Sequence, residues 1–186
     1  MANFVHLHVH TEYSLLDGLT KIKKLIPLIK EMGMTSIALT DHGNMYGAVE
    51  FFKICKKNDI KPIIGCEVYL APNGRFDKSA RNRRSYHLIL LVKNEQGYKN
   101  LMKLVSIGQL EGYYYKPRID WETLIKYKDG LICNSGCVEG EISQLILDDN
   151  YEKAKKRAKE FQDLFKEDYY LRSEEHTSEL QSRQVI

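Results

Sequence analysis

Residues 35–70 read TSIALTDHGNMYGAVEFFKICKKNDIKPIIGCEVYL, and this stretch decides the fold. Runs of apolar and β-branched residues at 35–40 and 60–70 predict two strands. The segment between them, 45–58, predicts a helix. The apolar residues spaced three apart along this helix are Val49, Phe52 and Cys55. A strand, a helix and a second strand in this order predict a parallel sheet or an α/β barrel.

The alternation of strands and helices continues on both sides of this stretch. Further strands are predicted at 4–9, 87–92 and 131–134. Further helices are predicted at 27–32, 96–107, 139–147 and 150–167. Pro27 would lie in the first turn of its helix, and Asn150 would cap the last helix. The run HLILLV at 87–92 is continuously apolar, which is typical of a strand buried on both faces. The chain is therefore predicted to have an α/β fold.

Length and composition restrict the chain to one domain with a sizeable core. It has 186 residues, of which 43% are hydrophobic and 28% are charged, and its formal net charge is +3. No apolar run approaches the ~20 residues that cross a bilayer, and the N-terminus has no signal-peptide pattern. The four cysteines form no CxxC pair, so a disulfide framework is not indicated. We therefore predict a cytoplasmic protein without a membrane partner.

One long polar stretch, residues 73–85, is rich in basic side chains. Its basic residues are Arg75, Lys78, Arg81, Arg83 and Arg84. A solvated loop is one interpretation of this stretch. Contact with nucleic-acid phosphates through Arg81, Arg83 and Arg84 is the other, and the mildly basic balance of the chain permits it.

The last residues of the chain do not follow the pattern of the rest. Residues 172–186 read RSEEHTSELQSRQVI, with neither helical nor strand periodicity. Residues 172–182 resemble the in-frame translation of a common sequencing-library adapter. We interpret 172–186 as a non-native tail and 1–171 as a domain whose last strands are missing. A natural polar tail is the alternative.

The sequence His6-Leu7-His8-Val9-His10 carries the strongest chemical signal. Side chains alternate along a strand, so these three imidazoles are predicted to point to one side. Several imidazoles on one face are costly to bury, because each needs a partner and protonating one opposes protonating the next. A metal ion resolves this conflict, because neutral imidazole is a good ligand for zinc, manganese or iron.

Five other segments offer further ligand-type side chains. Asp41 and His42 follow the predicted strand at 35–40, where catalytic groups gather in α/β barrels. Glu67 places a carboxylate inside an apolar strand, which is rare unless the carboxylate is paired or binds a metal. The remaining candidates are His87, Cys137 in a glycine-flanked turn, and Asp17 in an Asp-Gly turn.

These ligands are more than one tetrahedral zinc ion needs, so a cluster of two or three ions is predicted. Such ions activate water and stabilise the leaving oxygen of a phosphoester. The absence of a GxxxxGK motif excludes a P-loop nucleotide hydrolase.

The motifs that carry this chemistry also resemble a known family. They are HLHVHTEYSLLDG, LTDHGNMYGAVEF, KPIIGCEVYL, YHLILLVKN, LEGYYYKPRID and SGCVEGEI. They are similar to the PHP (polymerase and histidinol phosphatase) domain, in the form found at the N-terminus of bacterial replicative DNA polymerase III alpha subunits. The resemblance covers nearly all of residues 3–171, and it implies a distorted seven-stranded α/β barrel that is incomplete at its C-terminus.

The resemblance also implies roles for individual residues. The implied metal ligands are His8, His10, Asp17, His42, Glu67, His87 and Cys137. Of these, His8, His10, His42 and Glu67 would be catalytic, while Asp41 and His6 would support them. The last ligands of the family, from an Asp-x-His strand, have no counterpart in this chain.

The implied function is metal-dependent 3′–5′ exonuclease proofreading within a DNA-directed DNA polymerase. Its cofactors would be two or three divalent ions of Zn, Mn or Fe, with Mg for a polymerase reaction in a missing region. Its partners would be the 3′ end of primer-template DNA and, through missing regions, the sliding clamp and an exonuclease subunit. The alternatives are a non-catalytic, metal-stabilised scaffold and a small-molecule phosphatase of the same family.

Overall fold

The computed structural model describes residues 4–15, 17–80 and 83–172. The strand–helix–strand unit predicted first is present as β1 (Ser36–Leu39), α2 (Ala48–Lys57) and β2 (Lys61–Leu70). Strands β1 and β2 pair in parallel, as such a connection requires.

Helix α2 buries a different face from the one that the spacing predicted. Phe51 and Cys55 are buried, whereas Val49 and Phe52 are exposed. Phe51 and Phe52 are adjacent, so spacing alone did not distinguish their two faces. Phe51 packs into the hydrophobic core that α1 and β1 form with α2.

The predicted α/β fold is confirmed, and the sheet is mixed, so the purely parallel sheet that was one of the two predicted architectures does not form. β3 (Tyr86–Val92) returns antiparallel to β2, and β6 (Leu131–Asn134) is antiparallel to β3. No α-helix lies between β2 and β3 in the described residues, and an antiparallel return needs none. β3 has the expected burial on both faces.

Short strands complete the sheet at its edges. β5 (Lys116–Ile119) pairs in parallel with β2 and forms a hairpin with β4 (Tyr113–Tyr114). β7 (Tyr169–Tyr170) pairs in parallel with β6. The order is β4-β5-β2-β3-β6-β7, with β1 on β2, in a seven-stranded sheet.

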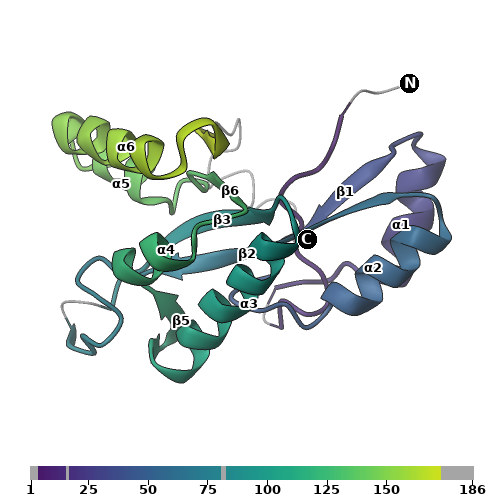
Figure 1. The fold of residues 1–186 in the computed structure, drawn as a ribbon, viewed down its shortest axis with the longest axis horizontal. Coiled ribbons are helices and arrows are strands. Elements are labelled where there is room, and N and C mark those ends of the chain that lie inside the picture. Colours follow the sequence, from purple (N-terminus) through teal and green to yellow (C-terminus); the bar gives the residue numbers. More distant parts are fainter. Residues whose placement is uncertain (1–3, 16, 81–82, 173–186) are drawn as a thin grey trace, which may run out of the picture.

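Helices cover this sheet in two groups (Figure 1). α1 (Ile22–Glu31) and α2 pack with β1 around one core. α3 (Glu95–Leu110), α4 (Trp121–Tyr127), α5 (Glu141–Leu147) and α6 (Tyr151–Phe165) surround a larger core on β2, β3 and β6. β2 belongs to both halves, so its residues lie where the two cores meet.

The helix boundaries correct two sequence predictions. Pro27 lies inside α1 and not in its first turn, because the helix begins five residues earlier, at Ile22. Asn150 occupies the N-cap position of α6, but its side chain donates to the carbonyl of Asp148 and makes no capping hydrogen bond to the helix. No helix in the described ranges combines the length and apolarity that a membrane span requires.

The N-terminal segment is extended but is not a regular strand, which corrects the prediction for 4–9. Two backbone bonds tie it to β1: the N–H of Ala38 donates to the carbonyl of His6 at 2.8 Å, and that of Thr40 to Val9 at 2.9 Å. Thr40 also accepts from the N–H of Val9 through Oγ1. A side-chain hydroxyl thus replaces one backbone hydrogen bond of the strand pairing, and the side chains of this segment do not alternate strictly between two faces.

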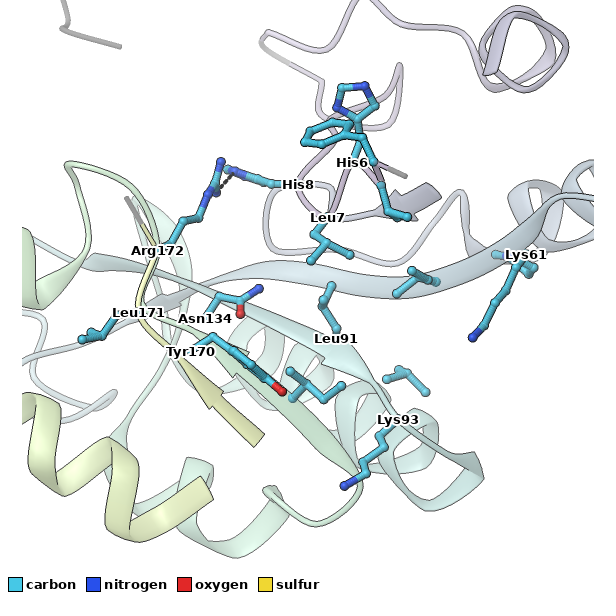
Figure 2. A pocket seen from close by; sticks show the side chains of 16 residues that line it. His6, Leu7, His8, Lys61, Leu91, Lys93, Asn134, Tyr170, Leu171 and Arg172 are labelled. Atoms are coloured by element: carbon cyan, nitrogen blue, oxygen red, sulfur yellow. Dashed lines mark hydrogen bonds between the residues drawn. The ribbon is translucent and has the colours of Figure 1, made fainter. Parts of the chain in front are cut away.

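A cavity of about 1020 Å³ lies between the N-terminal segment and β7 (Figure 2). Its walls include Leu7 on one side and Tyr170 on the other, above Leu91 of β3. The guanidinium of Arg172 spans the gap to Nδ1 of His8. Arg172 begins the predicted tail, whose residues 173–186 lie outside the described residues. Within the described part of the chain, no strand pairing bridges this gap.

Candidate metal centre

Glu67 of β2 lies at the centre of the candidate site. Its side chain is 1% exposed, yet both carboxylate oxygens face imidazole nitrogens. Oε2 is 2.7 Å from Nε2 of His8 and 3.6 Å from Nε2 of His10. Oε1 is 2.7 Å from Nδ1 of His42 and 3.0 Å from Nδ1 of His87. Four imidazoles from distant parts of the chain therefore converge on one buried carboxylate.

The surrounding imidazoles keep Glu67 ionised. Burial alone would raise the pKa of this carboxyl group, but the close nitrogens of His42 and His8 and the charge of His87 outweigh burial and lower it. The opposite holds for His10, whose pKa burial and the neighbouring His42 lower to about 4. At neutral pH the site thus offers an anionic oxygen beside a neutral imidazole, which is the donor set that a divalent cation requires.

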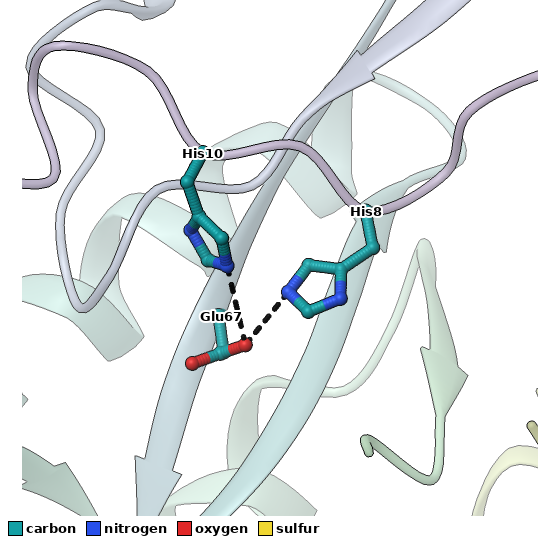
Figure 3. A group of neighbouring side chains, drawn as sticks. All are labelled: His8, His10 and Glu67. Carbon is teal, nitrogen blue, oxygen red and sulfur yellow. Dashed lines mark ion pairs between the residues drawn. The ribbon is translucent and has the colours of Figure 1, made fainter. Parts of the chain in front are cut away.

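The N-terminal segment supplies His8 and His10, as Figure 3 shows. One ligand atom from each and one from Glu67 all lie within 4.8 Å of one another. Three of the buried polar atoms in the site have no hydrogen-bond partner among the described residues although they lie close to one another: His8 Nε2, His42 Nδ1 and Glu67 Oε1. Donor atoms that converge without bonding one another fit a shared cation, so these residues fit the divalent ions that the sequence predicted.

The turn after β1 positions His42 against β2. His42 and Glu67 form an isolated parallel bridge, and the N–H of Gly43 donates to the carbonyl of Glu67 at 2.8 Å. Gly43 has a φ of +59°, and a Cβ there would lie 2.5 Å from Pro117. On its other side, His42 Nε2 is 3.0 Å from Oδ2 of Asp17. The Asp17 turn therefore folds back over the same site, as predicted.

His87 and Cys137 approach from the opposite side. Because β3 is antiparallel to β2, the beginning of β3 lies beside the end of β2, and His87 pairs with Tyr69. A ligand at the start of a strand therefore meets ligands at the ends of others. Cys137 Sγ lies 4.0 Å from Nδ1 of His87. The structure thus brings all seven predicted ligand candidates into one neighbourhood.

Asp41 supports the site through two residues that the sequence analysis missed. Its buried carboxylate accepts hydrogen bonds from the N–H and hydroxyl of Thr11, at 2.6 and 2.8 Å, and from the hydroxyl of Ser14 at 2.8 Å. Ser14 Oγ in turn accepts from the N–H of His42 and lies 3.4 Å from Nδ1 of His10. Single hydroxyl residues in a turn have no spacing pattern by which to find them.

His6 and the arginine candidates lie elsewhere. The His6 ring packs edge-on against Phe4, with centroids 4.8 Å apart, and not among the contacts of Glu67. Arg84 lies near Tyr86 and Asp148. Arg83 packs on Tyr115, beyond the site. Arg81 lies outside the described residues.

The chain is similar to known proteins over most of its length. The model of the PHP domain family matches residues 6–176. The DNA polymerase III subunit alpha of Borreliella burgdorferi is 52% identical over 177 residues, covering 94% of this chain and 15% of that protein. Its counterpart in Treponema pallidum is 49% identical over 177 residues, with the same coverage of 94% and 15%. The chain therefore spans about 15% of the length of these curated relatives. A solved amidohydrolase from Chromobacterium violaceum has a TM-score of 0.43 and 24% identity, over 58% of this chain and 34% of that one.

Proposed function

The chain belongs to the PHP domain family, and from this premise we propose that it is the N-terminal, metal-dependent phosphoesterase domain of a bacterial replicative DNA polymerase. Relatives about half identical to it are named DNA polymerase III subunit alpha. The polymerase reaction, with its Mg ions, would belong to the larger part of such a protein that this chain does not cover. The domain itself would remove nucleotides from DNA 3′ ends in the cytoplasm.

The observation that carries the proposal is the buried Glu67 with four imidazoles around it. Asp17 and Cys137 extend the donor set on either side. Divalent ions held there would activate water and neutralise the charge of a phosphodiester. A scaffold needs no such concentration of donors, because well-packed hydrophobic residues of equal volume in place of these charged and polar groups would cost less to fold.

The chain's own residues would prepare the site for this chemistry. Glu67 remains anionic and His10 remains neutral, so neither loses a proton when a cation binds. Asp41 holds the turn that carries Thr11 and Ser14, and thereby orients His10 and His42. The half-buried position of the imidazoles leaves the site open to a strand end while the carboxylate stays shielded from water.

A comparison of two activities in the full-length protein tests the proposal. We expect two or three Zn, Mn or Fe ions per chain by elemental analysis. We expect His8→Ala to lower 3′–5′ exonuclease activity on single-stranded DNA at least about a hundredfold, as loss of a metal-site residue does, while primer extension changes little. Equal loss of both activities would indicate a folding role for His8.

The same experiment separates the two alternatives. A metal-stabilised scaffold would bind the ions yet shorten no DNA 3′ end. A small-molecule phosphatase would hydrolyse histidinol phosphate or a similar monoester in preference to DNA. Either result would replace the exonuclease proposal.

A further inference from the structure

The β4–β5 hairpin carries exposed aromatic rings beside the candidate metal centre. Tyr113 and Tyr115 are 54% and 62% exposed. Tyr115 forms the tip, between the paired residues Tyr114 and Lys116. Its φ of +60° is a left-handed conformation that is strained for an aromatic residue. Such strain at an exposed ring persists only where the surrounding structure imposes it, and it is frequent at binding sites.

Two cations accompany these rings. The guanidinium of Arg83 lies 4.5 Å from the centroid of the Tyr115 ring. The ammonium of Lys116 lies 4.5 Å from the centroid of the Tyr69 ring. Among the described residues, neither cation forms an ion pair with a carboxylate. Both charges are therefore available to an anionic ligand.

The hairpin leads into the site through Tyr69. β5 pairs in parallel with β2, with Arg118 opposite Tyr69, which brings Lys116 level with Glu67. The Tyr69 ring lies 5.2 Å from the His87 ring and 6.1 Å from the His42 ring. Lys116 lies over the Tyr69 ring, and that ring in turn lies beside the imidazoles that surround the buried carboxylate.

A buried arginine fixes the hairpin to the basic stretch at 73–85. Arg118 is 0% exposed. Its guanidinium donates to the carbonyls of Gly112 at 3.1 Å, Arg75 at 3.2 Å and Asp77 at 3.1 Å. Burying a guanidinium is costly unless its donors find acceptors, and here Nε and Nη2 donate to backbone carbonyls of both segments. Residues 75–77 and the β4–β5 hairpin are therefore held together, and the Arg83 guanidinium lies against the Tyr115 ring at the tip.

We propose that Tyr113, Tyr115, Arg83 and Lys116 form a platform for single-stranded DNA whose 3′ end enters the Glu67 site. This inference rests on the proposed function, and it names the form of the substrate. Exposed rings stack on bases of any sequence, and interleaved cations neutralise the phosphates between them. An acidic peptide would use the cations but would leave the flat rings without partners, so the combination favours single-stranded nucleic acid.

Photochemical cross-linking tests the platform without relying on catalysis. The full-length protein is irradiated with an oligothymidylate that carries 5-iododeoxyuridine near its 3′ end, with a chelator present to prevent cleavage. We expect the adduct to map to the peptide containing Tyr113 and Tyr115. Tyr115→Asn, which tolerates the left-handed backbone, should reduce this adduct about tenfold, whereas Tyr115→Phe should retain it. Tyr151→Ala, which removes a ring 65% exposed on α6, is the matched control.

Kinetics provide the second measurement. We compare kcat/KM for shortening of the oligonucleotide with kcat/KM for hydrolysis of bis(p-nitrophenyl) phosphate, which is too small to reach the hairpin. The ratio of kcat/KM for the oligonucleotide to kcat/KM for the small diester should fall about tenfold in Tyr115→Asn and in Arg83→Ala. It should not fall in Lys103→Ala, which removes an exposed lysine on α3.

The outcomes separate the platform from the proposed function. If the wild type hydrolyses neither substrate, the proposed function fails, and the cross-link map alone decides whether the platform exists. If both substrates are hydrolysed but cross-links map only elsewhere and the ratio is unchanged, the platform is overturned while the function stands. The hairpin would then be open to a protein partner.

Discussion

At the scale of single residues, the four cysteines differ sharply in their surroundings. Burial raises the pKa of Cys55 to about 12 and also raises the pKa of Cys66 and Cys133. Cys137 alone is half-buried, and it lies beside His87. Because the thiolate is the reactive form, the first three thiols should be nearly inert at neutral pH.

This contrast gives a test of Cys137 as a ligand. Iodoacetamide at pH 7.5 should label Cys137 first in metal-free protein, and Zn should slow that labelling at least about tenfold, because a bound thiolate is no longer free to react. Peptide mass spectrometry follows each cysteine separately. Cys137→Ser provides the blank. Labelling of Cys137 at the same rate with and without Zn would remove it from the ligand set.

The residue scale also shows what the sequence could predict of the site. Glu67 was identifiable because a carboxylate in an apolar strand has few explanations. His8 and His10 were found through alternation, although the segment is not a regular strand, while the His6 ring, expected to support them, packs against Phe4. Thr11 and Ser14 were missed because their importance comes from Asp41, which lies about thirty residues away.

At the scale of elements, Asp120 holds the junction between β5 and α4. It caps α4 in a capping box, accepting from the N–H of Thr123 at 3.0 Å, and it also receives Nη1 of Arg75 at 2.9 Å. Burial would raise the pKa of Asp120, but the hydrogen bonds from Thr123 and Arg75 outweigh burial and lower it. The ionised form therefore stabilises the folded state.

Asp120→Asn should lower the free energy of unfolding by about 1 to 3 kcal/mol at pH 7. The substitution removes the negative charge that pairs with Arg75, while the amide of Asn can still cap α4 in part. A carboxyl group with a lowered pKa in the folded state stabilises above its unfolded pKa of about 3.9, and that contribution is lost as pH falls further. The difference between wild type and variant in urea unfolding should therefore shrink below pH 4. An equal difference at pH 3 and pH 7 would contradict this account. Glu152→Gln, which changes an exposed carboxylate in the first turn of α6, is the control.

The boundaries of the elements show which strands and helix faces a sequence pattern can predict and which it cannot. β1, β2, β3 and β6 follow the predicted ranges closely because each is a mainly apolar run. The hairpin β4–β5 was missed because strands of two and four residues are too short to show alternation. The face of α2 was misjudged because Phe51 and Phe52 offer two registers, and only packing against α1 and β1 selects one.

At the scale of the whole molecule, distant contacts decide what local patterns cannot. The sequence predicted alternating strands and helices, but the direction of β3 depends on how the chain returns after residues 71–85. That return is what brings His87 to Glu67 and places β5 on the other edge of β2. The mixed topology and the metal centre therefore have the same origin, and ions at the centre would join segments from both cores.

Because ions at the centre would hold segments of both cores together, we predict that metal removal destabilises the whole fold. Ions that bind only the folded state stabilise it by about 2.7 kcal/mol at a concentration a hundred times their Kd, so EDTA should lower the Tm of loaded protein by roughly 5 to 10 °C. Calorimetry of loaded and metal-free protein measures the difference. Glu67→Gln, which keeps the shape but removes the charge, should show no such shift.

The difference in Tm between metal-loaded and metal-free protein should increase with pH. Burial alone would lower the pKa of His42, but Glu67 and Asp17 outweigh burial and raise it above its ordinary value. Without metal, protonated His42 therefore stabilises the fold fully below the unfolded pKa of about 6.5, and this contribution is lost as pH rises through the folded pKa. A cation replaces that proton only at higher pH. The gap in Tm between loaded and metal-free protein should thus be small at pH 5 and widen toward pH 8, and a gap independent of pH would show that the ions bind away from these imidazoles.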